Sequence, residues 1–358
     1  MRKKHFLFAS VLALLCSSST LHAQDFKLTS SGYFKNQGVD VMAFDDIYPE
    51  GHQGGVCIIM NGHRVATNGD IRLEATPGQW QPVPKQLDRK LGDNSITATL
   101  CYPDSSRHLT GFNPMIYPDL HLIYTVNVES KGKNIEVTVD LDRPIPQEFI
   151  GKVGFNLEFF PGSLFGKPWI MDGQSGIFPQ QPNSPLMTTQ PNYLHTGNYH
   201  DGKKSLADMD KLIGKGYSPI VADDIISEPY AKGTKFTSRP DDPYNKVTIE
   251  SLSGDLQLFD GRMNHNNGWF VLRSNIKPGV TKGAVKWIIT PNVVADWMYQ
   301  PVIQTSQIGY HPTQDKEAVI EMDIRDNRKE TAQIIRIDAD GEKVVKNVTP
   351  ANWGKFLR

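Results

Sequence analysis

The residues best suited to chemistry lie in two aromatic-rich stretches in the middle of the chain. Residues 154–169 concentrate phenylalanines and one tryptophan among glycines and prolines, and residues 177–183 add amide side chains. Aromatic rings stack on the apolar faces of sugar rings, while ammonium and amide groups hydrogen-bond to sugar hydroxyls. An irregular loop held by a rigid sheet is where such groups act together. Three residues here are therefore candidate carbohydrate-binding residues: Trp169, Lys167 and Gln180.

Core packing is the competing interpretation of the same stretch. Several of its apolar residues are expected to fill the space between two sheets instead of binding a ligand. These residues are Phe155, Leu157, Phe159 and Phe165. For the three candidates named above, sugar binding and a purely structural role both stay open.

A second group of candidates lies in residues 263–269, where amides, an imidazole and an indole follow one another. His265 and Trp269 are the carbohydrate-binding candidates of this group. The same composition is also typical of the polar tip of a β-hairpin, so that alternative stays open as well.

The sequence contains no motif for catalysis, metal binding or a cofactor. It has no G-x-S-x-G, no phosphate loop, no HExxH and no cysteine or histidine spacing typical of zinc. The aspartate pairs at 223–224 and 241–242 stand in turn-like contexts, where solvated loop carboxylates are expected. We therefore predict no catalytic residue, no metal site and no cofactor in this chain.

The overall composition is that of a β-rich protein with many turns. The 358 residues carry 38 Lys and Arg against 39 Asp and Glu, and they include 30 glycines and 24 prolines. A nearly neutral chain lacks the basic footprint of a nucleic-acid-binding protein. Its length suffices for two domains.

The N-terminus predicts an exported protein. Residues 1–23 read as a secretory signal, with three basic residues, an apolar run at 6–15 and a cleavage site after Ala23. The apolar run is too short to span a bilayer, so we expect no membrane span and a periplasmic or extracellular location. Lipid anchoring at Cys16 stays open. Cys57 and Cys101 are expected to be buried thiols, with a disulfide as the alternative that an oxidising compartment allows.

Strand and turn signals run through residues 25–300. Residues 56–60 and 64–67 flank an Asn-Gly turn, a second turn is expected at Asn68 and Gly69, and residues 121–129 should pair with 134–141. Successive strands with short turns predict one large antiparallel β-sandwich, resembling a supersandwich.

The last segment begins with a recognisable pattern: a short apolar strand, a Gly-Tyr-x-Pro turn, a charged spacer and a second apolar strand. It resembles the N-terminal immunoglobulin-like domain of family 9 glycoside hydrolases, the cellulase family, whose opening reads V-x-Q-x-G-Y-x-P and then K-x-A-V. Extra residues stand between Val302 and Gln307. The matching positions are Val302, Gln304 or Gln307, Gly309, Tyr310, Pro312, Lys316, Ala318 and Val319.

The strand pattern and the resemblance together give the expected fold class, and the resemblance implies the function that we expect. The fold class is all-β: a large antiparallel β-sandwich at 25–300, then a truncated, incomplete immunoglobulin-like β-sandwich at 301–358. In family 9, inverting hydrolysis of β-glucans uses two carboxyl groups on a helical barrel that follows the immunoglobulin-like domain. This sequence has no long amphipathic helix to build such a barrel. The chain is therefore expected to be the non-catalytic N-terminal part of an endoglucanase-type enzyme.

The expected partners are a β-glucan-type polysaccharide and a C-terminal catalytic domain of the same polypeptide. A stand-alone exported glycan-binding or adhesion protein is the alternative. A third hypothesis is that the sandwich is itself catalytic, like a mutarotase or a lyase. That would require His, Lys, Tyr or Glu side chains to converge on one concave sheet face.

Overall fold

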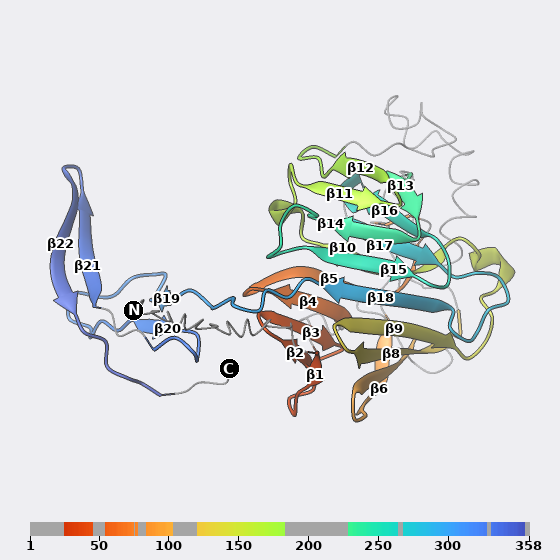
Figure 1. Cartoon of the computed structure of the whole chain (residues 1–358), viewed down its shortest axis with the longest axis horizontal. Coiled ribbons are helices and arrows are strands. Elements are labelled where there is room, and N and C mark those ends of the chain that lie inside the picture. The colour runs from red at the N-terminus through yellow and green to blue at the C-terminus, as the bar shows by residue number, and fades with distance from the viewer. Residues whose placement is uncertain are drawn as a thin grey trace, which may run out of the picture.

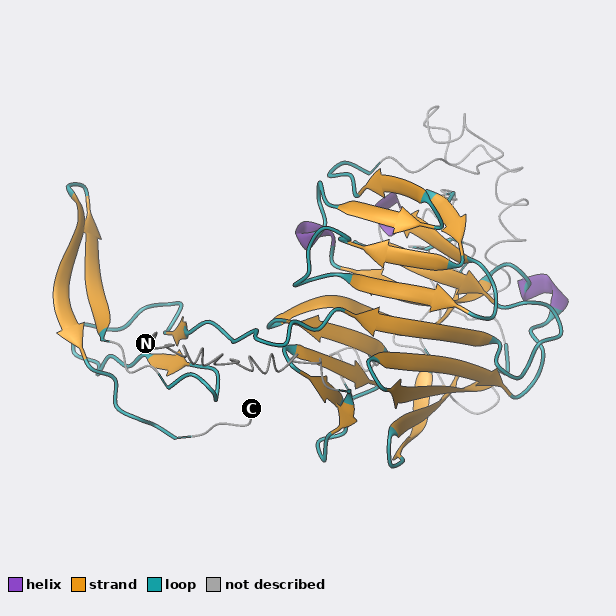
Figure 2. Ribbon diagram, in the orientation of Figure 1, coloured by secondary structure: helices purple, strands orange, loops and turns teal. Residues whose placement is uncertain are grey.

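The computed structural model describes residues 25–45, 54–74, 76–77, 84–102, 120–182, 228–263, 268–327 and 331–354. The signal sequence expected at residues 1–23 lies outside them. Within these ranges the chain forms two nine-stranded antiparallel sheets packed face to face, and the only helices are three short 3-10 turns (Figures 1 and 2). The predicted all-β sandwich is confirmed.

The first sheet contains the strands nearest the N-terminus together with strands from the middle of the chain. Its order is β1 (Lys27–Leu28), β2 (Phe34–Asn36), β3 (Val39–Ala43), β4 (Val56–Met60), β5 (His63–Leu73), β10 (Val153–Phe159), β17 (Phe270–Asn275), β16 (Leu256–Asp260) and β13 (Ala231–Gly233). The pairing of β5 with β10 brings together segments about eighty residues apart in the sequence.

The second sheet covers the inner face of the first. Its order is β12 (Gln174–Ile177), β11 (Pro168–Met171), β14 (Lys235–Ser238), β15 (Val247–Ser251), β18 (Val285–Pro291), β9 (Asn134–Leu141), β8 (Ile123–Lys131), β7 (Ser95–Cys101) and β6 (Lys85–Leu91). The 3-10 turns are η2 (Gln147–Phe149), η3 (Pro161–Ser163) and η4 (Gly261–Met263).

Alternating side chains define the central strands of the second sheet. In β8 and β9, every second residue is buried and the residues between them are partly exposed. Such alternation buries one face of each strand against the other sheet. The two strands pair from Lys131 with Asn134 to Tyr124 with Leu141, so the predicted hairpin is confirmed.

Strand β5 differs from the prediction. The expected second turn at Asn68 and Gly69 is instead a β-bulge inside one continuous strand, with Asn68 at a φ of 55° and register shifts toward both neighbouring strands. A Cβ at Gly69 would lie 2.6 Å from Val56 Cβ, so this close strand approach requires glycine. An Asn-Gly pair suits a bulge as well as a turn, and long-range pairing decides between them.

Aromatic residues join the two sheets. The rings of Phe155 and Trp287 lie edge to face with their centroids 5.0 Å apart, and those of Phe159 and Phe236 are 5.8 Å apart. The Trp287 indole N–H donates to Ser274 Oγ at 3.0 Å, so the large ring is buried without an unpaired donor.

Three of the four residues expected in the core are buried there: Phe155, Leu157 and Phe159. The prediction is wrong for Phe165, which is 36% exposed. Phe165 follows η3 rather than lying in β10, so the two-residue period of the strand does not extend to it. Cys57 in β4 and Cys101 in β7 are both buried.

The described residues after residue 300 form two separate two-stranded sheets. Strand β19 (Val302–Gln304) pairs with β20 (Val319–Glu321), and β21 (Ala332–Asp338) pairs with β22 (Gly341–Val348). The β21–β22 hairpin extends away from the sandwich (Figure 1). Its apolar side chains are exposed: Ile334, Ile335, Ile337, Val344 and Val345.

We expect the amides of β21 and β22 to exchange with solvent before those of β8, because local stability follows buried contacts and this hairpin has few. Hydrogen exchange on the whole chain measures the difference. A chain ending at Gln300 is the control, in which protection of β8 should be unchanged and solubility should rise. Equal protection of the hairpin and of β8 would contradict the expectation.

Candidate functional site

Polar and charged side chains gather on strands β5, β10 and β17 of the first sheet. Asp70, Asn156 and Arg273 are direct cross-strand partners in one row. Glu158 stands two residues after Asn156 and therefore shares its face. All of these residues are buried, together with Arg72 and Glu74 at the end of β5. We refer to these six residues as the polar cluster.

Arg273 is the best-connected member of the polar cluster. Its Nη1 lies 3.3 Å from Glu74 Oε1 and 3.3 Å from Asn156 Oδ1, and its Nη2 donates to the Glu74 backbone oxygen at 2.9 Å. Its Nε donates to Asn275 Oδ1 at 2.7 Å. Asn156 also donates to Glu74 Oε1 at 2.6 Å. Arg273 lies in β17, Asn156 in β10 and Glu74 directly after β5, so these contacts tie the three neighbouring strands together.

Arg72 and Glu158 form the other half of the polar cluster. Glu158 Oε2 accepts from Asn68 Nδ2 at 2.5 Å, and Asn68 owes its position to the β5 bulge. Burial lowers the pKa of Arg72, and the surrounding carboxylates, Glu158 first among them, outweigh burial and raise it. Arg72 Nε is a buried donor without a hydrogen-bond partner among the described residues.

Asp70 connects the polar cluster to the second sheet. Its Oδ1 accepts from the Tyr124 hydroxyl of β8 at 2.9 Å and from the Ile71 backbone N–H at 2.7 Å. Burial raises the pKa of Asp70 to about 6, against the lowering effects of Arg72 and these hydrogen bonds. Burial likewise raises the pKa of Tyr124 well above its ordinary value.

Glu74 is a buried carboxyl group whose pKa is shifted toward neutral pH. Burial raises its pKa to about 7, although the charges of Arg273 and Arg72 lower it. A carboxyl group with a pKa near 7 takes up and releases protons at neutral pH, which is the property of a general acid or base. Its side chain is only 2% exposed, however, so it is not placed to contact a substrate.

Of the residues predicted to bind carbohydrate, Trp169 is buried. It lies in β11 and is 7% exposed, and a Cβ on Gly176 would come within 2.4 Å of its Cζ2. Between the two alternatives left open by the sequence, this position corresponds to core packing. The ring offers little surface on which a sugar could stack.

Lys167, Gln180 and Trp269 lie around the end of β16. Lys167 and Gln180 are exposed, and the Gln180 carbonyl accepts from Arg262 Nη1 at 2.8 Å. The Trp269 carbonyl accepts from the Gly261 N–H at 2.9 Å, and its ring lies edge to face on a neighbouring phenylalanine. His265 lies outside the described residues.

Arg262 organises this surface, and the sequence interpretation missed it. Its guanidinium donates to the Asp260 carboxylate at 2.8 Å and lies 4.5 Å from the Phe270 ring centroid and 5.1 Å from that of Phe165. The available signal was an arginine two residues after an aspartate at the end of an apolar strand. We refer to Lys167, Gln180, Trp269 and Arg262 as the β16 surface.

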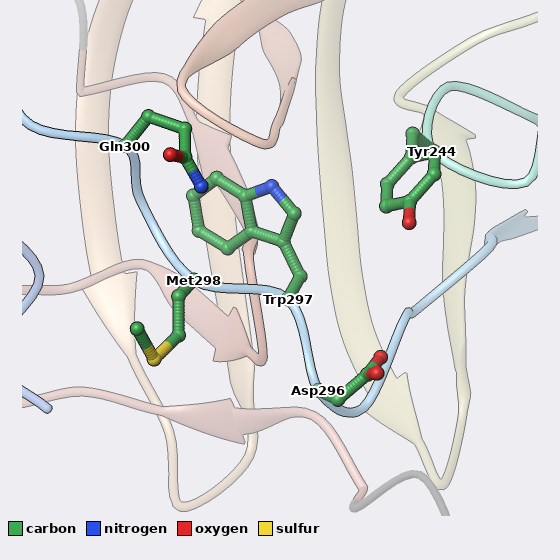
Figure 3. Close-up of a pocket in the computed structure, with 5 residues that line it drawn as sticks. All are labelled: Tyr244, Asp296, Trp297, Met298 and Gln300. Atoms are coloured by element: carbon green, nitrogen blue, oxygen red, sulfur yellow. The ribbon is translucent and has the colours of Figure 1, made fainter. Parts of the chain in front are cut away.

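A surface cavity of about 500 Å³ lies elsewhere, where β18 leads into the last segment (Figure 3). The residues that line it were not among the sequence candidates: Tyr244, Asp296, Trp297, Met298 and Gln300. An aromatic residue, a carboxylate and an amide at 296–300 were the signal that could have identified it.

Neither a metal site nor a membrane-spanning helix is found in the described part of the chain. No group of three or more His, Cys, Asp or Glu side chains there could hold a metal ion. None of its helices is long and apolar enough to cross a bilayer.

No protein family and no curated protein matches this chain by sequence. Among the solved structures that resemble it, three have a TM-score of 0.27 each. Heparan sulfate lyase HepC from Pedobacter heparinus is 11% identical, and the match covers 90% of this chain and 42% of HepC. The proposed mutarotase YeaD from Salmonella typhimurium is 8% identical, and the match covers 75% of this chain and 96% of YeaD. HI1317 is 9% identical, and the match covers 75% of this chain and 99% of HI1317.

The chain thus spans less than half the length of HepC. At such identities and TM-scores, no residue role or activity carries over from these proteins to this one. The class that the structure defines is an all-β protein with a large antiparallel sandwich, a buried polar cluster on one sheet and a cavity next to its last strand.

Glu74→Gln should flatten the dependence of stability on pH. Because the folded pKa of about 7 lies above the ordinary 4.5, the folded chain holds more protons, and the free energy of unfolding falls as pH rises from 4.5 to 7. The slope approaches ~1.4 kcal/mol per pH unit for one proton. Denaturant unfolding at several pH values measures it.

Glu250→Gln is the matched control, since this glutamate of β15 has a side chain that is 44% exposed. The control should keep the slope of the unsubstituted chain. An unchanged slope in Glu74→Gln would assign the titration to another group, with Asp70 the next to test.

Trp169→Ala should destabilise the fold, because it leaves a cavity beneath Gly176. Removing a large buried aromatic side chain costs about 3–5 kcal/mol of unfolding free energy. Ile170→Ala is the control, since the neighbouring side chain is 40% exposed and should cost much less. Equal stability of the Trp169 variant and the unsubstituted chain would contradict the burial of the ring.

Proposed function

We propose that this chain is the non-catalytic N-terminal part of an exported family 9 glycoside hydrolase of the endoglucanase type. In this role the sandwich serves β-glucan degradation by binding glycan and by bracing a C-terminal catalytic domain of the same polypeptide. The proposal rests on the sequence resemblance of the last segment and on the local geometry of that segment.

The observation that carries the proposal is the hairpin formed by the resembling residues. Strands β19 and β20 pair antiparallel, with Val302 opposite Glu321 and Gln304 opposite Val319. Between them the Tyr310 hydroxyl accepts from the Ser306 N–H at 3.2 Å and donates to the Glu317 carbonyl. The tyrosine of the Gly-Tyr-x-Pro pattern thus links the turn to the strand that follows it.

The bracing role is supported by the way the hairpin is attached. Asp323 Oδ2 accepts from the Tyr299 N–H at 2.9 Å, and Arg325 bonds both to Asp323 Oδ1, at 2.9 Å, and to the Trp297 carbonyl. The Arg325 side chain is the first cause that holds the pKa of Asp323 far below its ordinary value. The junction is therefore a defined set of contacts and not a loose tether.

The β16 surface supports the binding role. Exposed ammonium and amide groups next to partly exposed aromatic rings are the combination that recognises sugars. The buried Trp169 and His265, which lies outside the described residues, stay predictions from the sequence and carry no argument for this surface. A stand-alone exported glycan-binding or adhesion protein would use the same groups without a catalytic partner.

One observation favours a second candidate function, catalysis by the sandwich itself. The polar cluster places Glu74, Glu158 and two arginines on adjoining strands, and the pKa of Glu74 is near 7. Proton transfer at a sugar carbon, as in a mutarotase or a lyase, is the corresponding reaction class. The burial of Glu74 favours the non-catalytic proposal, because a substrate has no access to a side chain that is 2% exposed.

The purified chain should be retarded in gels containing soluble β-glucan, and Lys167→Ala together with Trp269→Ala should reduce the retardation. Lys133→Ala, on the exposed β8–β9 turn, is the charge-matched control. Unretarded migration on every glucan would contradict the binding role.

The same chain should release no reducing sugar from cellulose, mixed-linkage glucan or xyloglucan. It should also neither speed glucose mutarotation nor form unsaturated uronates from acidic polysaccharides. Any of these activities, lost in Glu74→Gln while the fold is kept, would establish the catalytic candidate instead.

A further inference from the structure

The cavity next to β18 combines two aromatic rings with polar groups at its rim. Figure 3 shows Tyr244 and Trp297 on opposite sides of the hollow, with Asp296 between them and the Gln300 amide beside the indole. Asp296 and Gln300 are exposed and Trp297 is half-buried. The hollow has a volume of about 500 Å³ and is open to solvent.

The Trp297 ring is held by the first sheet. A Cβ on Gly38, in the β2–β3 turn, would lie 2.7 Å from Trp297 Cε3, so the indole packs directly on the glycine backbone. Gln37 Nε2 donates to the Trp297 carbonyl at 2.8 Å. The Tyr299 ring supports the indole from another side, edge to face at 6.1 Å. One face of the Trp297 ring therefore packs against the protein, and this packing fixes the orientation of the other face.

The Tyr244 turn is held as firmly, by side chains that are not part of the cavity. Asp242 Oδ1 accepts from the Tyr244 N–H at 2.9 Å, and its Oδ2 accepts from Asn245 Nδ2 at 3.1 Å. Asn61 donates to the Tyr244 carbonyl, and Asn292 Nδ2 donates to the Pro243 carbonyl at 2.7 Å. The 48% exposed Tyr244 ring therefore stands on a rigid base. Rigid rings bind at a low cost in entropy.

The lining selects the chemical class of ligand. It contains one carboxylate, one amide and a phenol hydroxyl, and none of the five lining residues is basic. A carboxylate and an amide hydrogen-bond to hydroxyl groups, whereas the carboxylate repels uronates and sulfated sugars. A pyranose whose hydroxyls are all equatorial presents C–H groups on its ring faces, which suit contact with the aromatic rings that line the cavity.

We propose that this cavity is a binding site for a neutral oligosaccharide of β-linked glucose, with one sugar ring stacked at Tyr244 and Trp297. Asp296 and Gln300 hydrogen-bond to its hydroxyls. The inference deepens the proposed function, on which its choice of glucose rests, by assigning the glycan to a site distinct from the β16 surface.

The cavity also lies next to the contacts that attach the last segment to the sandwich. The carbonyl of Trp297 accepts from Arg325 as well as from Gln37, so the cavity wall is also the joint between the sandwich and the last segment. A bound oligosaccharide rests on both sheets through Tyr244 and Trp297 and reaches Gln300, two residues before the start of β19. The glycan is thereby held where the chain leaves the sandwich.

Isothermal titration of the whole chain with cellohexaose tests the assignment. Tyr244→Ala should weaken binding roughly 2- to 12-fold, the range that one aromatic stacking contact supplies. The double variant Tyr244→Ala with Gln300→Ala should bind cellohexaose more weakly than Tyr244→Ala alone. Trp297→Phe keeps a ring on Gly38 and should give an intermediate loss. Trp353→Ala is the matched control, since this tryptophan is 78% exposed and far from the cavity in sequence.

The outcomes distinguish failure of the cavity assignment from failure of the proposed function. Unchanged affinity in Tyr244→Ala and Gln300→Ala, with β-glucan retardation intact, overturns the cavity assignment and leaves the proposed function standing. A flat cellohexaose titration at millimolar concentration together with unretarded migration overturns both. Tri-galacturonate should not bind, and binding as tight as that of cellohexaose would overturn the assignment to neutral sugars.

Discussion

The structure depends on balancing the charges of two buried arginines, Arg72 and Arg273, within the first sheet. A guanidinium removed from water costs several kcal/mol unless carboxylates and hydrogen-bond acceptors replace the water. Arg273 meets this requirement through Glu74 and Asn156, which come from two other strands. Only one alignment of β5, β10 and β17 satisfies these contacts. The apolar inner face alone would allow the strands to slip by two residues, so it is the polar cluster that selects the register.

The same constraint explains the bulge in β5. Without the extra residue at Asn68 and Gly69, the row that contains Asp70 would not face Asn156 and Arg273. The bulge also presents Asn68 to Glu158. Bulges often mark functional sites because they re-aim side chains. Here the side chains that the bulge re-aims are buried. The polar cluster is therefore better suited to fixing the strand register than to catalysis.

The β16 surface and the Trp297 cavity are better places to seek function than the buried polar cluster, because their side chains reach the surface. Around β16, Arg262 holds exposed polar groups beside aromatic rings, and next to β18 the Trp297 segment forms a cavity and receives Arg325 from the last segment. Both places combine rigid sheets with irregular loops, the arrangement in which binding residues are usually found. The glycan-binding proposal depends on this local geometry and on the Gly-Tyr-x-Pro resemblance of the last segment.

Periodicity and turn chemistry in the sequence were enough for the sandwich, the β8–β9 hairpin and the burial of Phe155, because these depend on residues close together in the chain. Tertiary structure alone decided the bulge at Asn68, the burial of Trp169, the exposure of Phe165 and the meeting of Tyr244 with Trp297. It also brought Glu74 to Arg273 across 199 positions. An alternating pattern says which side of a strand is apolar, but partners, pKa shifts and cavities arise only when distant strands pack, since burial and Coulomb interactions depend on distance in space.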